Sequence, residues 1–151
     1  MSRIKLLLTD MEKQLLRKAK IKMADLGYLS IEEISERIGS DLKRAHQLQG
    51  LVVFQRIPSI GYALAEKLVF VLGIYSLDEI RHHDGASLFD RLEQRLGVWT
   101  DGCVEDQLRC VIHHAHYPHS SKQWFHFTEV RKSEREKNGY PKERPSKAWY
   151  E

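Results

Sequence analysis

Cysteine and histidine side chains gather in one part of the 151-residue sequence, where they could in principle bind a metal ion. Zinc prefers thiolate and imidazole ligands, and spacings of seven and four would put Cys103, Cys110 and His114 on one helix face. However, zinc sites usually take a pair of closely spaced ligands from each of two segments, and the sequence does not offer two such pairs. We therefore expect no metal and no other cofactor, and a metal site stays the less favoured alternative. The cluster comprises Cys103, Cys110, His113, His114, His116 and His119.

The two cysteines predict a reducing environment. Seven residues along a helix separate their Cα atoms by about 10.5 Å, which is beyond the reach of a disulfide. The run Ile4–Leu8 is too short for the core of a signal peptide. No apolar run approaches the roughly 18 residues that a membrane span needs. We expect a cytoplasmic protein without a membrane partner.

A second stretch with the chemistry for binding begins at Pro58. Pro58 resets the backbone after a helix, and Gly61 permits a left-handed or closely approached backbone just before the next helix. The first N–H groups of that helix have no intrahelical partner, and together with the helix dipole they favour an anion such as phosphate. The expected phosphate-binding residues are Ser59, Ile60, Gly61, Tyr62 and Ala63, assisted by Arg56 and Lys67.

This stretch resembles the helix-hairpin-helix family, whose core is Pro-Gly-apolar-Gly followed by a small and then an apolar residue. Pro58, Ile60, Gly61, Ala65 and Leu68 fit that core. The resemblance implies a protein that grips the DNA backbone, single- or double-stranded, without reading its base sequence. Ser59 stands where the family has its first glycine, so a positive φ at this position would be strained.

A longer resemblance, over about residues 52–132, is to the pathogenicity-locus family of small bacterial helix-hairpin-helix proteins, some of which are labelled mitomycin-resistance proteins. Asp101, Cys103 and Val104, then Arg109 and Cys110, and finally the aromatic segment 124–127 follow its pattern. The sequence departs from the pattern at Gly102, where arginine is usual, and at Phe125 and Phe127, where tryptophan is common. The resemblance implies a DNA-binding protein with a role in repair, recombination or uptake.

An enzymatic function is the least favoured hypothesis. Helix-hairpin-helix glycosylases that cleave the backbone carry a nucleophilic lysine two residues after the second glycine, where this chain has Ala63. Asp78 and Asp84 are better explained as helix caps than as catalytic carboxylates. We therefore expect a protein that is not an enzyme. A protein-interaction module that uses the hairpin only as a scaffold is the main alternative.

Apolar spacing and capping boxes predict an all-α fold of six or seven helices in one compact unit. Thr9 and Ser30 each precede a glutamate by three residues, which is typical of helix starts. Helices 86–96 and 103–116 could form a second, degenerate hairpin through Gly97 and Val98. The pair around Gly39 could form a DNA-reading helix-turn-helix, but its apolar second helix favours packing. The expected helices cover 10–26, 31–38, 42–54, 62–72, 86–96 and 103–116.

We expect the chain to have three parts. Residues 1–54 are expected to pack on the core, 55–130 to form the helix-hairpin-helix domain, and 131–151 to be a basic, disordered tail. Residues 1–130 carry 17 basic and 17 acidic side chains, so the whole net charge of +3 comes from the tail. We therefore do not expect a protein that coats DNA through a generally basic surface.

Overall fold

Short polar side chains start most of the helices. In the computed structural model, which describes residues 4–151, they accept a hydrogen bond from a backbone N–H in the first helical turn, as N-caps do. The capped helices are α1 (Asp10–Lys18), α2 (Ile31–Ile38), α3 (Leu42–Gln55), α5 (Leu77–Ile80) and α6 (Gly85–Leu96), with the caps Thr9, Ser30, Asp41, Ser76 and Asp84.

The remaining helical segments are α4 (Tyr62–Glu66), which continues as the π-helical turn η2 (Lys67–Val71), then α7 (Gly102–His116) and α8 (Thr128–Asn138). Two short 3-10 turns, η1 (Met23–Gly27) and η3 (Trp124–Phe127), are the other helical elements in residues 4–151. Residues 4–151 contain no strand, only an isolated bridge between Trp99 and Ala148. The expectation of an all-α fold is therefore confirmed.

The first helix is shorter than expected. Instead of running to Leu26, α1 ends at Lys18, because Lys20 takes a left-handed conformation with φ of 58°. The N–H of Ile21 then donates back to the carbonyl of Leu16 at 2.9 Å, which closes the helix end. This turn lets the separate segment η1 bring Leu26 fully into the core.

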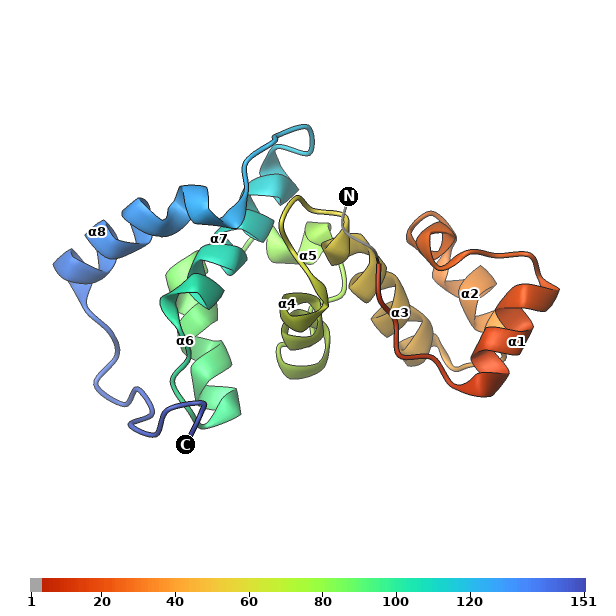
Figure 1. Ribbon diagram of the computed structural model, residues 1–151, viewed down its shortest axis with the longest axis horizontal. Coiled ribbons are helices and arrows are strands. Elements are labelled where there is room, and N and C mark those ends of the chain that lie inside the picture. The colour runs from red at the N-terminus through yellow and green to blue at the C-terminus, as the bar shows by residue number, and fades with distance from the viewer. Residues whose placement is uncertain (1–3) are drawn as a thin grey trace.

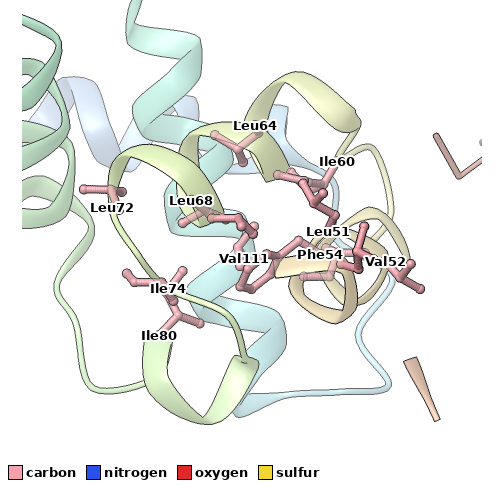
Figure 2. Packing of buried hydrophobic residues seen from close by; sticks show 14 of the residues in the cluster. Leu51, Val52, Phe54, Ile60, Leu64, Leu68, Leu72, Ile74, Ile80 and Val111 are labelled. Carbon is pink, nitrogen blue, oxygen red and sulfur yellow. The ribbon is translucent and has the colours of Figure 1, made fainter. Parts of the chain in front are cut away.

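The helices form an arch with α3 in its N-terminal half (Figure 1). At one end η1 and α2 pack against α3 and α1 packs on α2, and at the other end α7 packs on both α6 and α8. Between them, α4 contacts α3, and α5 contacts α7. Figure 2 shows the apolar core that joins these parts, where Phe54 of α3, Leu68 of η2 and Val111 of α7 meet.

Gly50 allows a close approach within this core. A Cβ atom at Gly50 would lie 2.9 Å from the backbone oxygen of Tyr75. The middle of α3 therefore lies directly against the segment that follows Gly73. Gly73 ends the preceding helical segment with φ of 68°, as its place in the sequence predicts.

The C-terminal residues differ from expectation. Residues 131–138 belong to helix α8, and the chain beyond it returns along α6 to the turn between α6 and α7. There the N–H of Trp99 donates to the carbonyl of Lys147 at 2.9 Å, and the N–H of Trp149 donates to the carbonyl of Trp99 at 3.0 Å. The expectation that residues 131–151 are disordered is wrong.

Ion pairs with buried carboxylates explain why this basic segment is held. Arg131 pairs with Asp106 at 2.7 Å, and Arg144 pairs with Glu93 at 2.8 Å. Arg135 lies 2.9 Å from Glu105, which is fully buried in α7 and also pairs with Arg109. A buried carboxylate is costly without a cation. These arginines therefore neutralise the acidic side chains of α6 and α7.

Both cysteines are free, as expected: Cys110 is buried and Cys103 is half-buried. Of the helices in residues 4–151, none has the length and apolar character needed to cross a membrane.

Candidate nucleic-acid interface

The connection between α3 and α4 is a tight turn anchored by two apolar side chains. Ile57 and Ile60 are buried in the core, and the N–H of Ile60 donates to the carbonyl of Ile57 at 3.1 Å. Pro58 and Gly61 are exposed between and after these anchors. The turn therefore presents a short stretch of backbone to solvent, while its apolar side chains fix its position (Figure 2).

Ser59 has φ of 67°, so the conformation that favours glycine occurs where the helix-hairpin-helix pattern places its first glycine. Its hydroxyl is occupied within the protein: the oxygen accepts a hydrogen bond of 2.9 Å from the N–H of Trp124, and the O–H donates to the carbonyl of Pro58. Ser59 therefore ties the turn to the segment after α7.

The backbone conformation of Gly61 is not the left-handed one that the sequence suggested. Its φ of −103° and ψ of −173° are extended values that any residue can adopt, so no left-handed turn requires glycine here. A Cβ atom at this position would have no neighbour within 4 Å among the described residues. The glycine instead leaves its Cα uncovered, so an external group can approach the backbone closely.

The N-terminus of α4 differs from the starts of α1, α2, α3, α5 and α6, which are capped by side chains. Gly61 is its N-cap residue, and no side chain within residues 4–151 accepts a hydrogen bond from its first turn. The first intrahelical bond is that from the N–H of Ala65 to the carbonyl of Gly61. The N–H groups of Tyr62, Ala63 and Leu64 thus precede the intrahelical hydrogen bonds of α4.

Two lysines lie close to this helix start. The Nζ atom of Lys5 lies 5.5 Å from the centre of the Tyr62 ring, and that of Lys67 lies 3.5 Å from the carbonyl oxygen of Ala63. Lys67 was expected here, but Lys5 was not. Burial and the neighbouring Glu66 carboxylate raise the pKa of Tyr62, so its hydroxyl remains a neutral donor.

Lys5 is positioned by a long-range contact that no local sequence pattern predicts. The side chain of Gln55 accepts a hydrogen bond from the N–H of Lys5 at 2.9 Å and donates to its carbonyl at 2.8 Å. Gln55 is almost fully buried at the end of α3. The N-terminal segment is therefore attached beside the turn.

Two of the expected binding residues are directed elsewhere. The guanidinium of Arg56 lies 3.9 Å from the centre of the Tyr28 ring and donates to the carbonyl of Ala24, so it packs against η1. The Ile60 side chain is only 1% exposed, and its N–H is used within the turn. The remaining expected residues, Ser59, Gly61, Tyr62, Ala63 and Lys67, lie together around the N-terminus of α4.

The expected second hairpin has the required helices, since α6 and α7 pack on one another around the connection 97–101. Gly97 ends α6 with φ of 73°, and the N–H of Thr100 donates to the buried Glu93 carboxylate at 2.7 Å. The backbone of Trp99 in this turn is paired with the C-terminal segment. The α6–α7 turn is thus partly covered, whereas Pro58 and Gly61 of the α3–α4 turn are exposed.

The cysteines and histidines do not converge on one point. Among residues 4–151, no three His, Cys, Asp or Glu side chains are grouped in a way that could hold a metal ion. The Nε2 atom of His114 lies 2.8 Å from the carbonyl of Lys122, that of His113 lies 2.9 Å from Ser120 Oγ, and that of His116 lies 2.9 Å from the carbonyl of Arg81. These rings act as links between α7 and its neighbours.

Comparison with known proteins gives a match to one family model. The family model described as Cdd1, Pathogenicity locus, matches residues 47–133, from the middle of α3 into α8. The match includes the α3–α4 turn, the α6–α7 pair and the aromatic segment η3. Comparisons with curated proteins and with solved structures gave no match.

Proposed function

The chain belongs to the Cdd1 pathogenicity locus family, and from the geometry of its α3–α4 turn we propose that it binds DNA through the phosphate backbone. In this proposal α3, the turn and α4 act as a helix-hairpin-helix motif. The backbone N–H groups of Tyr62 and Ala63 hold a phosphate oxygen beside the uncovered Cα of Gly61. We assign the site no catalytic step.

One observation carries the proposal: the N-terminus of α4 is exposed, begins at glycine and lacks a capping side chain among residues 4–151. Free N–H groups and the positive end of the helix dipole attract an anion. Because Gly61 takes the extended backbone usual for N-cap residues and its Cβ position is open, serine or aspartate would fit there. Glycine leaves that place for an external oxygen.

The charges near the turn suit a small number of phosphate contacts. Lys5 and Lys67 lie beside the helix start, while Arg131, Arg135 and Arg144 are engaged with buried carboxylates. With two or three phosphates engaged, we expect a log–log salt slope of about −2 to −3 on duplex DNA. Contacts to phosphates carry no base information, so binding is indifferent to sequence.

A cytoplasmic location goes with this proposal. Both cysteines are free, which agrees with a reducing compartment, and DNA is available as a partner there.

The test is to fill the anion site with a cap from the protein itself. In Gly61→Ser the hydroxyl accepts the N–H groups of the first turn, so the variant keeps the fold and its stability changes by only a few tenths of a kcal/mol. We expect its affinity for a short DNA duplex to fall tenfold or more, because hydrogen bonds to a charged group contribute about 1.5–3 kcal/mol. The measurement is fluorescence anisotropy at two salt concentrations.

Two further variants separate the site from general charge. Gly61→Val removes close approach without adding a cap, and we expect it to bind as weakly as Gly61→Ser. Lys132→Ala removes an exposed positive charge from α8 and should cost less affinity than either. If folded Gly61→Ser and Gly61→Val bind DNA like the parent, the turn is not the anchor. The protein-interaction hypothesis would then replace this proposal.

A further inference from the structure

The segment between α7 and α8, residues 117–127, lies directly beside the proposed DNA-binding turn. The hydrogen bond from the N–H of Trp124 to Ser59 fixes the two together. In Figure 1 the α3–α4 connection runs close to the C-terminal end of α7, from which this segment emerges. A strand of DNA held at Gly61 therefore passes near residues 117–127.

This segment and the last turn of α7 together line a cavity of about 500 Å³ that is open to solvent. That size falls within the range of about 300–1,000 Å³ in which proteins bind small organic groups. Tyr117 is its largest exposed wall, with 62% of the residue accessible to solvent. The ring of His113 lies 4.9 Å from that of Tyr117 and helps to hold it. The other walls include His116, His119 and Lys122.

The charge of the cavity suits an anion. Within residues 4–151, no carboxylate lines it, and Lys122 supplies a positive charge. The Lys122 side chain is exposed, unlike the arginines of the C-terminal segment that are committed to Glu93, Glu105 and Asp106. An aromatic wall next to an exposed ammonium group matches a base and its phosphate, respectively.

We propose that this cavity receives an unpaired nucleotide, whose base stacks on Tyr117 and whose phosphate lies toward Lys122 and His119. The ligand is then DNA with a single-stranded segment, anchored at α4 and continuing across residues 117–122. This inference rests on the proposed function, because the turn at Gly61 brings the strand to the cavity.

The experiment compares three labelled DNAs: a short single strand, a blunt duplex, and the same duplex with a single-stranded overhang. We expect the parent protein to bind the single strand and the overhang more tightly than the blunt duplex. Tyr117→Ala should weaken binding of the single strand and of the overhang by roughly 5- to 150-fold, the range expected for one stacked base. Its affinity for the blunt duplex should not change.

Conservative and matched variants define the role of the ring. Tyr117→Phe keeps the stacking face and should bind all three DNAs like the parent. Tyr150→Ala removes a tyrosine of similar exposure, 66%, from the C-terminal segment and should also leave binding unchanged. Because Tyr117 is mostly exposed, each variant is expected to fold, and circular dichroism checks this.

The outcomes separate this inference from the proposed function. If Gly61→Ser weakens all binding but Tyr117→Ala affects none of the three DNAs, the cavity assignment is wrong and the anchor stands. If Tyr117→Ala weakens single-strand binding while Gly61→Ser has no effect, the anchor is wrong and the cavity stands. If the parent binds none of the three DNAs, both are wrong.

Discussion

The hydroxyl oxygen of Ser59 accepts a hydrogen bond of 2.9 Å from the backbone N–H of Trp124, 65 positions further along the chain. Ser59 has a left-handed φ of 67°, which is unfavourable for a residue with a Cβ atom. Ser59 thus has a strained backbone and also accepts a long-range hydrogen bond. Both effects are measurable by substitution.

Ser59→Gly and Ser59→Ala separate the two effects. Both variants lose the hydrogen bond to Trp124, but only glycine relieves the backbone strain. We expect Ser59→Gly to be more stable than Ser59→Ala by about 1–2 kcal/mol, the cost of a left-handed backbone for an L-residue. Urea unfolding of both proteins gives this difference. Equal stabilities would mean that position 59 does not keep its positive φ in solution.

The Arg131–Asp106 pair supplies a second test, this time of the C-terminal segment. Asp106 is only 1% exposed, and the guanidinium of Arg131 bonds to both of its carboxylate oxygens, at 2.7 and 3.2 Å. Arg131→Ala leaves this carboxylate buried without its cation. We expect a loss of about 3–5 kcal/mol in the free energy of unfolding, measured by urea denaturation.

Lys132→Ala is the matched control for Arg131→Ala. It removes the same charge from the next position of α8, where the side chain is exposed. Its stability should stay within about 0.5 kcal/mol of the parent, as is usual for surface substitutions. If both variants unfold at the same urea concentration, α8 is not held to α7 by this pair.

Local signals account for the part of the fold that the sequence predicts correctly. Thr9 and Ser30 cap helices through bonds that span three positions. Gly39 and Gly73 end helices with positive φ. Such features depend on neighbouring residues alone, so they can be read without tertiary structure. The free state of both cysteines followed from helical spacing in the same way.

Long-range contacts account for what was missed. The charged, proline-containing residues 131–151 resemble a disordered tail until Arg131 is seen to face Asp106, 25 positions away. Lys5 joins the candidate site only because Gln55, 50 positions away, binds its backbone. Arg56 was expected at the site, but its stacking on Tyr28 directs it elsewhere. No periodicity or motif carries these pairings.

The cysteines give a prediction about reactivity. Burial raises the pKa of Cys110 to about 11, and its Sγ lies 3.7 Å from the carbonyl oxygen of Lys122. Burial, together with Asp101 and Asp106, also raises the pKa of Cys103. Because the thiolate is the reactive form, both thiols should react slowly with a disulfide reagent at pH 8. In urea, both should react at the rate of a free cysteine.

Cys103→Ser shows which thiol any remaining reaction comes from. Cys103 is half-buried and Cys110 is buried, so slow labelling of the native parent should disappear in Cys103→Ser. Rapid labelling of Cys110 in the native variant would contradict its burial beneath the segment that contains Lys122.

His113 links stability to pH. Burial lowers the pKa of His113 below its usual 6.5, and His114, Lys122 and His116 lower it further through their positive charge. In the unfolded chain the ring takes up a proton near pH 6.5, whereas in the folded protein it stays neutral to lower pH. The unfolded state therefore binds more protons in this window, and the free energy of unfolding should fall as the pH drops below 6.5.

His113→Gln removes this titration, so its stability should depend less on pH between 6.5 and 5.5 than that of the parent. Urea unfolding at pH 7.5, 6.5 and 5.5 measures both slopes, and parallel curves for the two proteins would show that His113 titrates alike when folded and unfolded.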